Sequence, residues 1–234
     1  MSSADLPSPH RRNALWLFYQ FTLQVVFQFW LGYRARGLQN VPPSGGGLIL
    51  ANHQSFLDPL LIGLPLRRPI SYVARDSLFR VPVIGWILRN TYVMPINRSA
   101  ASPAMLRDAI RRIEHGFLVG VFPEGTRTHN GDVGTFKPGF ISLIRRARTT
   151  VYPVGIAGAH LALPRHAWFL KPKRVHVVFG EPLTYAELEP FLEKGNEQQL
   201  LEFIRERVCA CQHEAEAWRE GRGSRVQSPE PEKE

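Results

Sequence analysis

The sequence predicts an α/β fold: a largely parallel, mixed sheet flanked by helices. Short apolar runs of strand length alternate with helical segments through most of the chain. Polar turns follow several of these apolar runs directly, as they do at the carboxyl ends of strands in open α/β sheets. With 234 residues, 44% of them hydrophobic, the chain can form one substantial core. We therefore expect one domain with an added N-terminal element.

The N-terminal element begins with residues 1–12, which are rich in Ser and Pro and are expected to be disordered. Residues 14–33 carry no charge, and Gln20, Gln24 and Gln28 form one polar stripe on an otherwise apolar, aromatic helix. We expect this helix to associate with a membrane by lying in or dipping into one leaflet. A spanning helix and an ordinary core helix are the alternatives.

The middle of the chain contains three predicted strands. The first is fully apolar and precedes a polar turn and a short helix at 60–64. A segment with internal Pro and Gly, residues 77–88, predicts a broken or interfacial helix. The three strands are expected at residues 47–51, 70–74 and 92–96.

The second half repeats the alternation of strands and helices. Residues 103–115 have the clearest helical period, with Leu106, Ala109, Ile110 and Ile113 on one face. The polar tail at 221–234 is expected to be disordered. The remaining predicted elements are strands at 117–122, 151–156 and 174–180, and helices at 137–148 and 197–218.

The overall composition limits the classes of binding partner and the cellular compartment that we expect. A net charge of +9 favours nucleic acid, anionic headgroups or a polyanionic cofactor. Nucleic acid is disfavoured because the arginines are dispersed and no nucleic-acid-binding signature is present. Cys209 and Cys211 are two residues apart, which favours a reducing compartment without disulfides. On a helix, Cys211 points away from Cys209 and His213, so we expect no metal site.

The turn from Asn52 to Asp58 holds the first candidate site. His53 lies where a strand hands over to a helix, and Asp58 follows five residues later. Such a pair is suited to a general base with an orienting acid. Ser55 and Asp58 also have the spacing of an S-x-x-D capping box, which would make them helix-start residues. The two interpretations are compatible if His53 folds back over the first turn.

Two further polar turns follow strands, at Asn97 and Arg98 and at Glu124 to Arg127. In a parallel sheet these turns gather at the edge that carries His53. Arg98 and Arg127 have the forked donors that suit a phosphate, and Lys137 adds a point charge. No G-x-S-x-G elbow exists and no cysteine follows a strand, so direct transfer to a bound hydroxyl is simpler than a covalent intermediate.

Four motifs in this order make the chain resemble the glycerolipid acyltransferase family, typified by 1-acylglycerol-3-phosphate (lysophosphatidate) acyltransferase. The resemblance covers about residues 35–185. Asn97 stands where the family usually has Asp. The motifs are N-H-x4-D at Asn52 to Asp58, a second block from Val81 to Arg98, F-P-E-G-T-R at Phe122 to Arg127 with F-K-P-G at Phe136 to Gly139, and V-Y-P-V-G-I at Val151 to Ile156.

The resemblance implies transfer of a fatty acyl group from acyl-CoA or acyl-carrier protein to lysophosphatidic acid, giving phosphatidic acid. It assigns His53 as base and Asp58 as its acid, and places Pro153 on the acyl-donor side. No metal or prosthetic cofactor is required. The expected partners are the membrane lipid surface, the lysolipid and the acyl donor, without nucleic acid. The residues implied in acceptor binding are Arg98, Glu124, Gly125, Thr126 and Arg127, to which the turn analysis adds Lys137.

The expected organisation is therefore residues 1–33 as the disordered start and membrane-associated helix, 34–220 as the acyltransferase domain, and 221–234 as the tail. The protein is expected at a membrane, with its site on the cytoplasmic side. Two alternative functions stay open. One is the same chemistry on another lysolipid, such as a lyso-ornithine lipid. The other is a membrane-binding module without activity, which the intact His53 and Asp58 pair disfavours.

Overall fold

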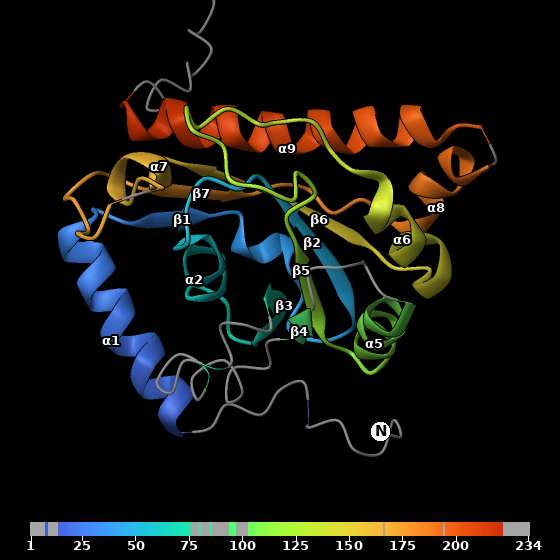
Figure 1. The fold of residues 1–234 in the computed structure, drawn as a ribbon, viewed down its shortest axis with the longest axis horizontal. Helices are drawn as coiled ribbons and strands as arrows, with labels where there is room; N and C mark the ends of the chain where they lie inside the picture. Colours follow the sequence, from blue (N-terminus) through green and yellow to red (C-terminus); the bar gives the residue numbers. More distant parts are fainter. Residues whose placement is uncertain are drawn as a thin grey trace, which may run out of the picture.

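The computed structural model describes residues 14–75, 94–96, 103–165, 167–193 and 195–221, together with Ser8, Arg80 and Gly85. In this described part, one seven-stranded sheet has the order β1-β7-β6-β2-β5-β3-β4 (Figure 1). Neighbouring strands are parallel except for β6 and β7. The strands are β1 (Arg34–Arg36), β2 (Gly47–Ala51), β3 (Ile70–Arg75), β4 (Met94–Ile96), β5 (Leu118–Val121), β6 (Val151–Ala157) and β7 (His176–Phe179).

Helices cover both faces of the sheet, so the predicted α/β class with a largely parallel, mixed sheet is confirmed. The prediction missed β1, α7 and α8, which are three or four residues long. The broken helix expected at 77–88 lies outside the described residues, apart from Arg80 and Gly85. The helices are α1 (Ala14–Trp30), α2 (Asp58–Gly63), α5 (Pro103–Glu114), α6 (Ile141–Ala147), α7 (Ala159–Ala162), α8 (Tyr185–Leu188) and α9 (Glu197–Arg219), with 3₁₀ turns η2 (Leu38–Asn40), η3 (Pro138–Phe140) and η4 (Glu189–Leu192).

The central strand β2 is buried on both faces, which explains its uninterrupted apolar sequence. Because side chains alternate along a strand, Ile49 and Ala51 join the core under α1, α2 and α7. Leu48 and Leu50 join the opposite core under α5, α6 and α9. The result is a three-layer arrangement with the sheet in the middle.

The C-terminal helix α9 packs its backbone directly onto β6. A Cβ placed on Gly155 would lie 2.1 Å from the backbone nitrogen of Gln212. Both cysteines are free. Cys211 is buried, with its sulfur 3.8 Å from the carbonyl oxygen of Pro153, whereas Cys209 is half-buried.

The N-terminal helix turns two residues of its polar stripe, Gln20 and Gln24, toward the protein, whereas Gln28 is exposed. Gln20 donates to the carbonyl oxygens of Leu64 and Leu66, at 2.6 and 2.9 Å, and Gln24 donates to that of Leu64 at 2.5 Å. None of the helices in the described ranges has both the length and the apolar character needed to cross a bilayer. The outward face carries the exposed apolar side chains of Leu17, Phe18, Phe21, Val25, Val26, Phe29 and Trp30.

The contact between β6 and α9 gives the first prediction. Gly155→Ala should lower the free energy of unfolding by about 1–3 kcal/mol, because the new methyl group forces α9 away from the strand. Gly63→Ala is the matched control, since no atom lies within 4 Å of the added carbon. Urea denaturation measures both. Equal midpoints for the two variants would contradict the tight backbone packing.

Candidate active site

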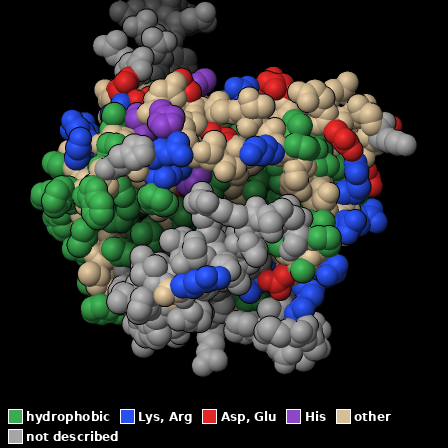
Figure 2. Space-filling view, viewed as in Figure 1, with side chains coloured by type: hydrophobic (Ala, Val, Ile, Leu, Met, Phe, Trp, Pro, Cys, Tyr) green, Lys and Arg blue, Asp and Glu red, His purple; other side chains and the backbone are tan. Residues whose placement is uncertain are grey.

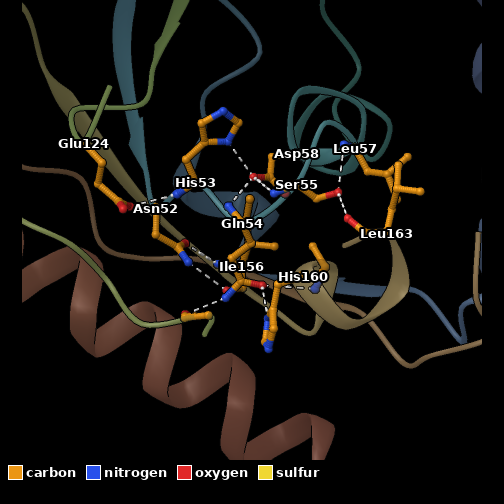
Figure 3. A network of polar contacts seen from close by, with 12 residues as sticks. Asn52, His53, Gln54, Ser55, Leu57, Asp58, Glu124, Ile156, His160 and Leu163 are labelled. Carbon is orange, nitrogen blue, oxygen red and sulfur yellow. Dashed lines mark hydrogen bonds and ion pairs between the residues drawn. The ribbon is translucent and has the colours of Figure 1, made fainter. Parts of the chain in front are cut away.

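The histidine of the first polar turn lies at the carboxyl end of β2, just before α2 (Figure 3). Its Nδ1 lies 2.8 Å from Oδ2 of Asp58, so the structure brings the two predicted residues together. The ring of His53 is partly exposed and the Asp58 carboxylate is fully buried. The other ring nitrogen, Nε2, points away from Asp58. Nε2 is therefore the ring nitrogen that does not contact the carboxylate.

Asp58 is held by its own turn. Oδ2 also accepts hydrogen bonds from the backbone N–H groups of Gln54 and Ser55, at 2.6 and 2.8 Å. Burial raises the pKa of Asp58, while the bond to His53 and these two N–H donors oppose the rise. An ionised Asp58 places the imidazole proton on Nδ1 and keeps Nε2 as an acceptor.

The expectation that the Ser55 side chain caps α2 is wrong, although one half of the expected capping box forms, because the Asp58 carboxylate accepts from the N–H of Ser55. The N-cap position of α2 is occupied by Leu57, whose side chain makes no capping hydrogen bond. The hydroxyl of Ser55 accepts from the N–H of Leu57 at 3.4 Å and donates to the carbonyl oxygen of Leu163 at 3.1 Å. Asp58 is already the first residue of the helix because its carboxylate is drawn back to the preceding turn.

The turn after β5 holds the backbone of His53 on both sides. The N–H of His53 donates to Oε1 of Glu124 at 2.9 Å, and the N–H of Thr128 donates to the carbonyl oxygen of His53 at 2.8 Å. The Phe122 ring stacks on the imidazole, with centroids 4.2 Å apart. Glu124 is buried, which raises its pKa. The F-P-E-G-T-R turn therefore positions the histidine.

Two neighbours of His53 anchor the turn to β6 and α7, and sequence reasoning missed both. The side-chain amide of Asn52 donates to the carbonyl oxygen of Ile156 at 3.0 Å and accepts from its N–H at 2.7 Å. Gln54 accepts from the N–H of Ala159 at 3.0 Å. Both side chains are buried. A polar residue in a turn is ordinary, so only these distant backbone partners reveal the role.

Of the two basic residues near the site, Arg127 belongs to the same turn and Lys137 lies just before η3. The guanidinium of Arg127 lies 3.6 Å above the ring of Phe56, which fixes its plane. Gly125 adopts a left-handed conformation, with φ of 69°, and the amino group of Lys137 lies against it. Gly125, Thr126 and Lys137 are exposed. These residues form an open cationic rim next to the buried Glu124.

Two expected site residues do not join this group in the described structure. Arg98 lies outside the described residues. Pro153 is buried in β6, and it faces α9 because residues alternate along the strand. A Cβ on Gly180 would lie 3.2 Å from the ring of Pro153, which places that ring in the core.

The family model described as Acyltransferase matches residues 33–157. This range includes the turn from Asn52 to Asp58, the turn from Phe122 to Arg127, and Ile156. The chain belongs to the acyltransferase family. A 1-acyl-sn-glycerol-3-phosphate acyltransferase from Pseudomonas aeruginosa is 32% identical over 186 residues, covering 73% of this chain and 70% of that protein. One of the same name from Bacillus subtilis is 25% identical over 187 residues, covering 80% and 91%.

A solved structure agrees with these sequence relatives. The crystal structure of the 1-acyl-sn-glycerophosphate (LPA) acyltransferase PlsC from Thermotoga maritima matches with a TM-score of 0.64 and 26% identity. The match covers 80% of this chain and 79% of that one. The recognition of the family from its motifs is therefore confirmed, and the protein is an enzyme similar to 1-acylglycerol-3-phosphate acyltransferases.

The second prediction concerns the anchor under the histidine. Asn52→Ala leaves both backbone groups of Ile156 buried without these partners, so stability should fall by about 1–3 kcal/mol or more. Asn40→Ala is the control, because Asn40 makes one half-buried bond, to the carbonyl oxygen of Phe179. Urea denaturation compares the two variants. A loss for Asn52→Ala no larger than for Asn40→Ala would refute the anchoring role.

Proposed function

We propose that this acyltransferase moves a fatty acyl group from acyl-CoA or acyl-carrier protein to the free hydroxyl of lysophosphatidic acid, giving phosphatidic acid. The observation that carries the proposal is the 2.8 Å contact between His53 and Asp58 at the end of β2. The names of the relatives support this choice of acceptor, since both are 1-acyl-sn-glycerol-3-phosphate acyltransferases.

In the proposed reaction, Nε2 of His53 takes the proton of the lysolipid hydroxyl as its oxygen attacks the thioester carbonyl. Asp58 stabilises the imidazolium that forms. The tetrahedral intermediate collapses, the carbon–sulfur bond breaks, and the imidazolium returns the proton to the departing thiolate. An oxygen ester replaces a thioester, so the step needs no metal or prosthetic group and no covalent enzyme intermediate.

We further propose that the cationic rim binds the acceptor's phosphate. Arg127 and Lys137 supply the charges, and the exposed Gly125 and Thr126 line the same turn. Arg98, which follows β4 in the sequence, is proposed to complete the set. Glu124 contributes by positioning His53, since one of its oxygens already accepts from the histidine N–H. Pro153 is proposed to shape the donor side only through the packing of β6.

We also propose that the enzyme works at the cytoplasmic surface of a membrane. The exposed apolar face of α1 supports this, because that face turns away from the core while Gln20 and Gln24 turn toward it. The net charge of +9 suits anionic lipid and the phosphates of CoA. The free cysteines suit a reducing compartment.

The third prediction tests the reaction. Purified protein with oleoyl-CoA and lysophosphatidic acid should give phosphatidic acid by mass spectrometry. His53→Ala should lower the turnover at least about 10²–10⁴-fold, because proton transfer from the hydroxyl is lost. His213→Ala, which removes an exposed histidine of α9, is the control and should match the wild type. Unchanged turnover in His53→Ala would contradict the role of His53 as the general base.

The acceptor is tested in the same assay by competition with other lysolipids, including a lyso-ornithine lipid. Preference for lysophosphatidic acid supports the phosphate-binding rim. Transfer only to phosphate-free lysolipids would keep His53 and discard that rim. No product with any acceptor and either donor would contradict catalysis.

The fourth prediction concerns α1. Replacing Phe21 and Phe29 by Ser should lower binding to lipid vesicles at least about tenfold, because two exposed aromatic rings are lost. Gln28→Ser on the same helix is the control. Deletion of residues 1–33 is a poor test, since Phe27, Leu31 and Tyr33 belong to the core. Wild-type vesicle binding by the double variant would overturn the role of α1.

A further inference from the structure

A second exposed apolar element follows α7. We name the described residues 163–165 and 167–173 the Trp168 loop. Its Trp168 and Phe169 are 94% and 82% exposed, although both are large apolar side chains. Large aromatic side chains are normally placed where most of their surface leaves water. This pair therefore indicates a surface that a partner covers.

Two carbonyl oxygens of the loop accept hydrogen bonds from side chains of other elements. The carbonyl oxygen of Leu163 accepts from the Ser55 hydroxyl at 3.1 Å. The carbonyl oxygen of Leu170 accepts from the indole N–H of Trp30 at 3.0 Å. The first bond joins the loop to the turn that holds Asp58, and the second joins it to the end of α1. The loop thus connects the site to the N-terminal helix (Figure 1).

The charge of the loop selects an anionic partner. Arg165, Lys171 and Lys173 are exposed on either side of the aromatic pair. The sequence contains no acidic residue between Asp132 and Glu181. Aromatic rings flanked by basic side chains are typical of segments that lie in the headgroup region of anionic membranes.

The loop is also continuous with the apolar face of α1. Trp30, which contacts the loop, and its neighbour Phe29 are exposed. Figure 2 shows hydrophobic side chains gathered over α1 at the left of the view, with Lys and Arg side chains along their upper edge. Loop and helix therefore offer one surface to the same partner.

We propose that the Trp168 loop is a second membrane-binding element, which inserts Trp168 and Phe169 into the headgroup boundary of a bilayer containing anionic phospholipid. The proposal deepens the proposed function, because it rests on a lipid substrate at a membrane surface. The bond between Ser55 and Leu163 ties the inserted loop to the catalytic turn. Insertion consequently fixes the height of His53 above the bilayer.

The test uses the full-length protein and flotation with two kinds of vesicle, phosphatidylcholine alone and phosphatidylcholine with phosphatidylglycerol. Trp168→Ser/Phe169→Ser should weaken binding to both at least about tenfold. Lys171→Glu/Lys173→Glu should weaken binding at least about tenfold only to the anionic vesicles. The matched control, Arg107→Glu/Arg146→Glu, reverses two exposed charges on α5 and α6. It should retain more binding to the anionic vesicles than Lys171→Glu/Lys173→Glu.

Further measurements separate the failures. Thermal melting shows that each variant is folded, and activity on a dispersed short-chain lysolipid should be unchanged in Trp168→Ser/Phe169→Ser. Wild-type vesicle binding by that variant overturns the loop proposal, even where acyl transfer is intact. A wild-type dimer that this variant dissociates, measured by light scattering, would assign the surface to a second copy and also overturn it. Vesicle binding that depends on the loop, in a protein without acyl transfer, would support the loop proposal and refute only the proposed function.

Discussion

A buried carboxylate constrains the whole site. Asp58 is fully buried, and a charged group in such a place needs donors close at hand. Two backbone N–H groups of the preceding turn and the ring of His53 provide them, all to one oxygen. The chain must therefore fold back between β2 and α2. This folding fixes both the orientation of the imidazole and the start of the helix.

The parallel arrangement of β2, β5 and β6 supplies the remaining support. Because these three strands run in one direction side by side, their carboxyl ends lie at one edge of the sheet. The turn after β5 holds the N–H and the carbonyl oxygen of His53, while Ile156 of β6 holds Asn52. The histidine is thus positioned by its backbone, its ring face and its Nδ1 together. Such positioning would reduce the reorganisation needed for the proposed proton transfer.

The surface beside the site depends on hydrogen bonds between α1 and the end of α2. The carbonyl oxygens of Leu64 and Leu66, near the end of α2, accept hydrogen bonds from the glutamines of α1. Since these bonds help to fix how α1 is rotated, Phe27 enters the core while Phe21 and Phe29 face outward. The Trp168 loop continues this surface through the indole of Trp30. One arrangement of polar contacts thus connects the exposed apolar surface to the turn that holds His53.

The sequence by itself determined the α/β class, most element positions, the family and the pairing of His53 with Asp58, because apolar periodicity and motif spacing are local properties. Only the tertiary structure decided the roles of Asn52, Gln54 and Glu124, whose partners come from distant strands and turns. The structure also shows that Ser55 is not the N-cap of α2 and that Pro153 lies in the core. The direction of Gln20 and Gln24 depended on the end of α2, at least forty residues away. Contacts between residues far apart in sequence leave no periodic signal, so folding alone reveals them.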